Sequence, residues 1–274
     1  MSRRGSSLPL VALGLLGLVA ATPGVAQVPP LLTAPDPWVP PGDGAAIGTD
    51  AIWKFAASLG GSKTTGNSSS SQVNLSGEAA RITDDSKLSL AARGLYAENN
   101  DARTAANLYI NTQYDRDFSR DWFGFGKVDG LRDHPANIEL RHSLYGGVGY
   151  HVFRTADNTW DISGGVGYTE DNYVRPTTVA GEERTQYGRL EAVLAESSSH
   201  KLTDTTSLRQ KLGIFPNLRN GGEYRAVFDA GLSVAINATL SLTAGMTYRY
   251  DSDPGTGLGK VDAVYVTGIG FKWD

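Results

Sequence analysis

The chain has 274 residues, of which 40% are hydrophobic and 20% are charged, and its formal net charge is −4. This composition excludes a bundle of membrane-spanning helices, which would be far more apolar, and the negative charge disfavours nucleic acid as a partner. The sequence has no cysteine, which excludes disulfides and thiolate chemistry, while its 33 glycines and 12 tyrosines favour strands and turns.

Residues 1–26 have the layout of a secretory signal. Arg3 and Arg4 precede an apolar run at 8–21, and small residues follow up to Ala26. The run is too short for a stable transmembrane helix, which makes an uncleaved anchor the weaker alternative. We therefore expect a signal peptide that directs export through the inner membrane and is cleaved after Ala26.

Residues 27–50 are rich in proline and glycine. Six prolines fall between positions 29 and 41, and such a segment cannot form the hydrogen-bonded ladders of a sheet. The segment is predicted to be an extended periplasmic linker, with disorder as the alternative. Whether it plugs the domain that follows is left open by the sequence.

From residue 51 to residue 274, apolar and polar residues alternate with a period of two. The clearest example places Tyr224, Ala226, Phe228, Ala230, Leu232, Val234 and Ile236 on one face, and Arg225, Asp229 and Ser233 on the other. Similar segments lie at 240–250, 262–273, 87–96, 106–115, 140–152, 160–169, 189–194 and 208–214, with fainter ones at 52–60, 70–82 and 120–130. A helix does not produce this pattern, so we expect about 12 strands.

The connections between these strands alternate in length. Short ones are predicted near 84–85, 118–119, 156–158, 203–204 and 237–238, and longer ones at 61–69, 98–104, 130–137, 171–185, 216–222 and 251–260. Transmembrane barrels have tight turns at one rim and long loops at the other, an order that a soluble sandwich has no reason to keep. Residues 51–274 are therefore predicted to form an all-β, antiparallel transmembrane β-barrel in the outer membrane of a Gram-negative bacterium.

Aromatic residues support the same topology. With both termini in the periplasm, one group falls at the lower strand ends, namely Trp53, Phe55, Tyr114, Tyr150, Trp160, Phe271 and Trp273. A second group falls at the upper ends, namely Tyr96, Tyr168, Tyr224, Tyr248 and Tyr250. Two aromatic girdles flanking an apolar band are typical of outer-membrane barrels. The expected partners are outer-membrane lipid and lipopolysaccharide.

Several short motifs resemble a known family, the salt-induced outer-membrane proteins, also called domain of unknown function 481. The motifs are Gly66-Asn67-Ser68, the run from Tyr114 to Ser119, Phe123-Gly124-Phe125-Gly126, Asp129, Arg141, and Gly-Gly-Val-Gly-Tyr at 146–150 and again at 164–168. The resemblance covers about residues 50–274. It implies an outer-membrane barrel and no established activity.

The last strand carries the expected insertion signal. Ile269, Phe271 and Trp273 alternate at the C-terminus, although Asp274 follows where a barrel usually ends on an aromatic residue. Recognition by the barrel-assembly machinery and by periplasmic chaperones is expected to depend on these three residues.

The polar face of the strands supplies the candidate functional residues. Those predicted to face the lumen are Arg93, Arg141, Arg189, Arg209, Lys211, Arg225, Arg249, Asp115, Glu191 and Asp229. One interpretation is a passage for small anions or sugar acids, and the other is a salt-bridged, filled barrel that supports the envelope under salt or osmotic stress. Neither interpretation calls for a cofactor or a metal.

A lipid-modifying enzyme is the third alternative. His142 is the nearest candidate on the outward face, but position 144 is Leu144 and Ser143 points to the other side, so no catalytic residues are predicted. The Gly-Gly-Val-Gly-Tyr sequences lie inside predicted strands with no helix after them. They are interpreted as close-packing glycines and not as nucleotide-binding loops.

Overall fold

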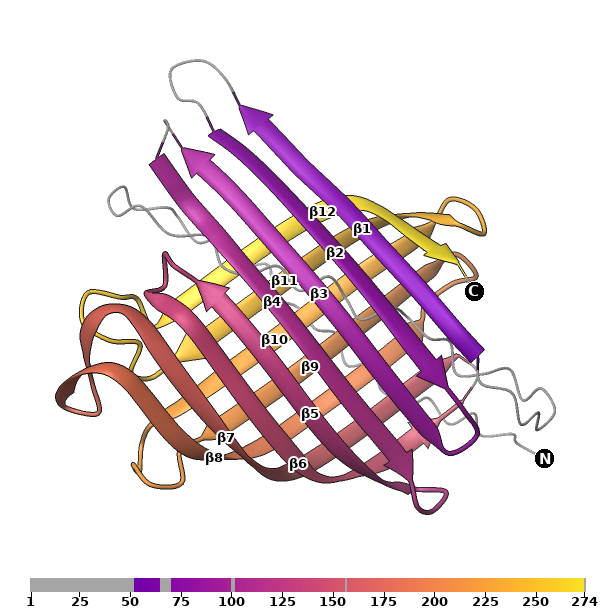
Figure 1. Cartoon of the computed structure of the whole chain (residues 1–274). Coiled ribbons are helices and arrows are strands. Elements are labelled where there is room, and N and C mark those ends of the chain that lie inside the picture. The colour runs from indigo at the N-terminus through magenta and orange to yellow at the C-terminus, as the bar shows by residue number, and fades with distance from the viewer. Residues whose placement is uncertain (1–51, 65–69, 100–101, 156, 274) are drawn as a thin grey trace, which may run out of the picture.

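The computed structural model of the chain describes residues 52–64, 70–99, 102–155 and 157–273, and these residues form a closed barrel (Figure 1). The strands are β1 (Ile52–Thr64), β2 (Ser70–Ile82), β3 (Ser86–Asn99), β4 (Ala102–Asp117), β5 (Trp122–Asp133), β6 (Ile138–Arg154), β7 (Asn158–Val179), β8 (Glu182–Lys201), β9 (Thr206–Pro216), β10 (Tyr224–Ala235), β11 (Leu240–Asp251) and β12 (Val261–Trp273). The predicted signal peptide (1–26) and linker (27–50) lie outside the described residues.

Every strand pairs antiparallel with the next strand along the chain, and β12 pairs with β1 to close the sheet. This closing pair is short, running only from Phe55↔Trp273 to Leu59↔Ile269, whereas β1 pairs with β2 along its whole length. The prediction of an all-β antiparallel barrel of about 12 strands is confirmed. Within the described ranges, no helix is long and apolar enough to cross a membrane.

The two ends of the barrel differ in their connections. At the turn end, tight turns lie at 83–85, 118–121, 202–205 and 236–239, as the sequence predicts, and Thr155 N–H donates to the Asn158 carbonyl between β6 and β7; here β1 begins and β12 ends. We call the opposite end the loop end. There the predicted loop at 171–185 is wrong, because β7 continues to Val179 and β8 starts at Glu182, joined by Ala180-Gly181 with positive φ values of 51° and 76°.

The predicted loop at 98–104 is also largely strand, because β3 extends to Asn99 and β4 starts at Ala102. In β7, a register shift between Asn172 and Thr177 marks the place where the alternation fades. Backbone hydrogen bonds between strands do not require an apolar face. The strands therefore extend into segments in which apolar and polar residues do not alternate.

The outer surface is apolar along the middle of the strands. Large hydrophobic side chains are exposed there, among them Leu90, Leu108, Ile110, Leu144, Val148, Val166, Leu194, Leu242 and Ile269. Aromatic pairs occur near both ends: Trp122 and Tyr150 have ring centroids 5.1 Å apart near the turn end, and Tyr224 and Tyr250 stack at 5.0 Å near the loop end. An exposed apolar surface of this extent requires a covering of similar chemistry.

The Gly-Gly-Val-Gly-Tyr sequences of β6 and β7 line the inner wall with alternate glycines. A Cβ atom on Gly149 would collide with the ring of Phe123, and one on Gly167 would collide with the ring of Tyr145. By contrast, nothing lies within 4 Å of a Cβ placed on Gly126 of β5. The inward glycines therefore admit aromatic rings that lie flat against the wall, and the close-packing interpretation is confirmed.

Candidate functional site: the barrel interior

Inward-facing side chains form two distinct regions. The first, which we call the ion-pair cluster, consists of Arg141 and Tyr145 of β6, Thr169 and Asp171 of β7, Arg189 and Glu191 of β8, and Arg225 of β10. The second, which we call the turn-end cavity, is lined mainly by β1, β2 and β9–β12. Of the residues predicted to face the lumen, the structure brings Arg141, Arg189, Glu191 and Arg225 together in the cluster.

Glu191 is the centre of the ion-pair cluster and is 1% exposed. Its carboxylate accepts hydrogen bonds from the Tyr145 hydroxyl at 2.8 Å and from Thr169 Oγ1 at 2.7 Å. Arg189 Nε donates at 3.0 Å, and Arg225 donates to both oxygens at 3.1 and 2.7 Å. A buried carboxylate needs such a set of donors, because the loss of its water shell is otherwise very costly.

Asp171 is the second buried carboxylate of the cluster, also 1% exposed. Arg141 binds both of its oxygens, with Nη2 to Oδ2 at 2.7 Å, and Arg189 Nη2 lies 3.1 Å from Oδ2. Arg189 therefore bridges the two carboxylates, and Arg225 reaches across β9 with its guanidinium carbon 5.3 Å from the centroid of the Phe215 ring. The cluster joins β6, β7, β8 and β10, so it links strands that are not neighbours in the sheet.

The carboxylates that neutralise these arginines were partly missed from the sequence. Asp171 fell inside the segment that was predicted to be a loop. Glu78 fell in the faint segment at 70–82, and it accepts a hydrogen bond from Arg93 Nη2 at 3.0 Å with both side chains buried. Continuing the inward–outward alternation of β7 past Thr169 would have placed Asp171 on the inward face. There it is the cross-strand neighbour of Arg141 in β6.

The remaining predicted residues lie outside the cluster. Asp229 accepts a hydrogen bond from Thr247 Oγ1 at 2.7 Å, and Asp115 accepts one from Gln113 Nε2 at 2.8 Å. Lys211 is the cross-strand neighbour of Asp229 and is exposed, although its strand position faces inward. Arg249 is the cross-strand neighbour of Asp262. The role of these residues in passing solutes stays a prediction.

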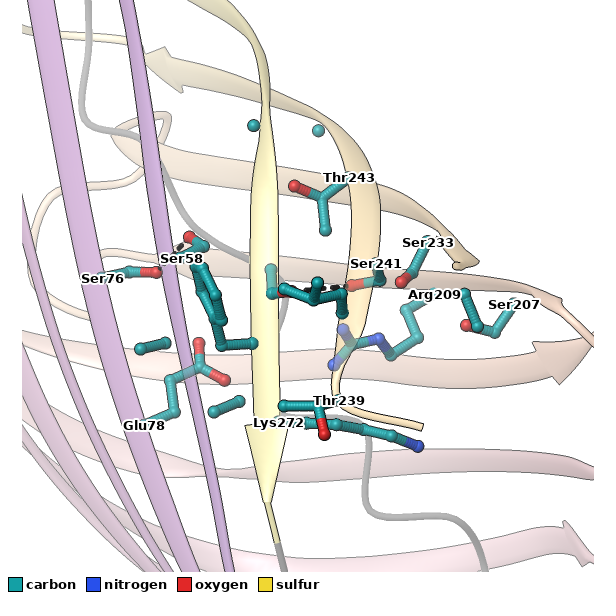
Figure 2. Close-up of a pocket in the computed structure, with 18 of the residues that line it drawn as sticks. Ser58, Ser76, Glu78, Ser207, Arg209, Ser233, Thr239, Ser241, Thr243 and Lys272 are labelled. Atoms are coloured by element: carbon teal, nitrogen blue, oxygen red, sulfur yellow. Dashed lines mark hydrogen bonds between the residues drawn. The ribbon is translucent and has the colours of Figure 1, made fainter. Parts of the chain in front are cut away.

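The turn-end cavity has a volume of about 200 Å³. Eleven of the residues that line it carry hydroxyl groups, namely Ser58, Ser76, Thr203, Thr205, Thr206, Ser207, Ser233, Thr239, Ser241, Thr243 and Thr267, and apolar side chains lie between them. Ser58 and Ser76 are hydrogen-bonded to each other at 2.7 Å (Figure 2). A single water needs roughly 10–15 Å³ of such space, so the cavity is large enough for a cluster of waters or one small organic solute.

Charged groups lie at both ends of this cavity. Arg209 and Glu78 reach into it from opposite walls, β9 and β2 (Figure 2). Lys54, Lys201 and Lys272 lie at the turn end with Asp204. Lys201 Nζ is 2.9 Å from Asp204 Oδ1, and this hydrogen bond lowers the pKa of the exposed Asp204. Four basic side chains against two carboxylates make the wall electropositive.

The alternative enzyme site is not assembled around His142. His142 Nε2 lies 3.8 Å from Glu170 Oε1, while Ser143 is buried on the inward side, where its Oγ lies 3.1 Å from Thr169 Oγ1. His142 and Ser143 therefore belong to opposite faces of β6. No group of three or more His, Cys, Asp or Glu side chains in the described part of the chain is arranged to hold a metal ion.

The C-terminal strand presents two of its predicted insertion residues on the outer surface. Ile269 is 47% exposed and Phe271 is 41% exposed, and β12 ends at Trp273 beside β1. Recognition of Ile269, Phe271 and Trp273 by the assembly machinery stays a prediction.

The family model described as "Protein of unknown function, DUF481" matches residues 57–273. No curated protein matches the chain significantly.

Among solved structures, the NanC porin is 10% identical to this chain with a TM-score of 0.48, and the match covers 80% of this chain and 100% of that one. An outer membrane channel, COG4313, from Pseudomonas putida F1 is 12% identical with a TM-score of 0.45, covering 85% and 98%. The KdgM porin, solved with disordered oligogalacturonate, is 8% identical with a TM-score of 0.42, covering 81% and 100%. These values are too low to transfer an activity, a solute or a location.

Proposed function

The chain belongs to the DUF481 family of proteins of unknown function, and we propose that this member is a channel for small solutes in the bacterial outer membrane. The membrane assignment is supported by the apolar outer band, by the aromatic side chains near both strand ends and by the even number of strands. A soluble barrel would bury its apolar side inward, whereas here the interior carries arginine, aspartate and glutamate.

The orientation follows from the two ends. Short turns and both chain termini lie on the periplasmic side of bacterial barrels, so the turn-end cavity would open to the periplasm and the loop end to the exterior. Export would use residues 1–26, and insertion would use Ile269, Phe271 and Trp273 as the signal for the assembly machinery and chaperones. Lipopolysaccharide would surround the loop end.

One observation carries the channel proposal: a hydroxyl-lined cavity occupies the lumen at the turn end, and the lumen is still accessible around Lys211 farther along β9. Hydroxyl groups offer both a donor and acceptors, so they replace water around a passing solute with little loss of hydrogen bonding. The basic residues of the wall favour anions over cations.

Insertion of the refolded protein into a planar bilayer tests this proposal. We expect unit conductance steps and, under a salt gradient, a reversal potential that indicates anion preference. Lys211→Gln removes a positive charge from the lumen and should reduce that preference, whereas Arg116→Gln, an exposed arginine beside the turn at 83–85, should not. Absence of conductance at any voltage would rule the channel out.

The ion-pair cluster favours a second candidate, a non-conducting barrel that supports the envelope under salt or osmotic stress. Because the cluster cross-links strands that are not adjacent, it stiffens one side of the barrel. This candidate predicts a deletion strain that grows poorly in high salt and is rescued equally by the native chain and by Lys211→Gln. Normal growth of the deletion strain in high salt would count against it.

A further inference from the structure

The inner end of the turn-end cavity contains an arginine whose hydrogen-bonding capacity is only partly used. Arg209 Nη1 is buried and has no hydrogen-bond partner in the part of the chain that the structure describes. The cross-strand neighbour of Arg209 is Gly231, and the next one is Gly245, so neither of these two positions places a side chain beside Arg209. Figure 2 shows the Arg209 guanidinium extending into the cavity. A planar guanidinium that lines a cavity suits a carboxylate.

On the opposite wall of the cavity, Glu78 offers a hydrogen-bond acceptor but does not neutralise the charge of Arg209. Glu78 Oε1 is paired with Arg93 Nη2 at 3.0 Å, and both residues lie within electrostatic range of Arg209. Two arginines and one glutamate leave one positive charge at this level of the lumen. Glu78 lines the cavity, and its Oε2 is buried with no hydrogen-bond partner among the described residues, so this acceptor is unused.

A row of hydroxyl groups lies directly beside Arg209. Ser207, Ser233 and Thr243 are successive cross-strand neighbours on β9, β10 and β11, and all three line the cavity. In the strand register the pair Ser207↔Ser233 follows the pair Arg209↔Gly231 toward the turn end, and Figure 2 shows the three hydroxyl residues on the same side as Arg209. Such a row can donate to and accept from several hydroxyls of one molecule.

We propose that this end of the cavity is a binding subsite for a small polyhydroxylated acid, of the sugar-acid class with a single carboxylate. Arg209 binds the carboxylate, and Ser207, Ser233 and Thr243 bind the hydroxyls. The proposal rests on the proposed channel function and narrows it to a class of solute. A neutral sugar leaves Arg209 without its anion, and a simple carboxylate leaves the hydroxyl row unused, so each should bind more weakly.

Equilibrium binding to the full refolded chain in detergent micelles tests the subsite, with D-glucuronate, D-glucose and acetate as probes in titration calorimetry. Glucuronate should bind at least about tenfold more tightly than either of the others, because a charge-assisted pair adds to the hydroxyl contacts. Arg209→Ala should reduce glucuronate binding to the level of glucose. The double variant Ser207→Ala/Thr243→Val should reduce it to the level of acetate.

Arg116→Ala is the matched control, since its side chain is 67% exposed outside the cavity, and it should leave glucuronate binding unchanged. Equal binding of glucuronate and glucose, or full binding by a folded Arg209→Ala variant, would overturn the proposal. If Arg209→Ala does not fold, Arg209→Lys decides: it keeps the charge but loses the planar fork, so unchanged binding would also overturn it.

Bilayer conductance separates this proposal from the channel itself. Conductance without preferential glucuronate binding removes the subsite and leaves the channel. Glucuronate binding that depends on Arg209, in a barrel that passes no current, supports the subsite and removes the channel.

Discussion

Two walls of this barrel are built from the same alternating pattern yet are lined in different ways. On β6, β7 and β8 the inward positions toward the loop end carry long charged side chains, and these interlock around Glu191 and Asp171. On β9 to β12 and β1 the inward positions near the turn end carry mainly serine, threonine, alanine and glycine, with Lys54, Arg209 and Lys272 among them, and a cavity of about 200 Å³ remains. The comparison teaches that the size and charge of the inward residues, and not the strand pattern, decide where a barrel is filled.

The largest effect is expected from breaking the ion-pair cluster. Glu191→Gln keeps the volume of the side chain but leaves Arg189 and Arg225 short of a counterion. Removing one partner of a buried ion pair costs about 3 kcal/mol or more, so the free energy of unfolding in urea should fall by about that amount. Tryptophan fluorescence of the refolded protein in detergent micelles measures it.

Asp204→Asn is the control on the other wall, at the exposed rim of the cavity. Because Lys201 lowers the pKa of Asp204, the pair stabilises the fold above the ordinary pKa of an aspartate and loses this effect as the pH falls through the lowered value. The pair is exposed and screened, so we expect no measurable change at neutral pH. A loss for Asp204→Asn equal to that for Glu191→Gln would mean that the two walls do not differ.

A smaller effect is expected from the inward glycines that make close packing possible. A Cβ atom on Gly147 would collide with the backbone of Gly164 and Gly165 in β7, so Gly147→Ala should destabilise the barrel by about 1–3 kcal/mol. Gly126→Ala places its methyl group in open space and should be neutral or stabilise by roughly 0.5 kcal/mol. Equal urea midpoints for the two variants would contradict this account of the filled wall.

The smallest effect on stability, but a clear one on transport, is expected from filling the cavity. Ser233→Leu adds apolar bulk to the hydroxyl row and should lower the unit conductance by about half, while stability changes by less than about 1 kcal/mol. Val234→Leu, the next residue on the outer face of β10, is the matched control and should leave the conductance as it is. Unchanged conductance for both variants would place the passage elsewhere in the lumen.

Much of the fold could be predicted because the outer face of the barrel takes an apolar residue at every second position. Segments such as 224–236 alternate so regularly that the strand, its outward face and its inward arginine and aspartate follow from the sequence alone. The alternation stops where the apolar outer band ends. Residues 171–179 therefore looked like a loop, although they continue β7 as a hydrogen-bonded hairpin with β8.

The candidate site shows the same division. The sequence alone determined that the interior is polar, that Arg209, Arg225 and Glu191 share it, and that glycines line parts of β6 and β7. Only the tertiary structure decided that Arg225 of β10 binds Glu191 of β8, two strands away. It also decided that Arg209 has glycines as cross-strand neighbours and lies at the end of a cavity. The reason is that alternation fixes which side of the sheet a residue faces. The stagger and closure of the strands fix which inward residues meet across the lumen.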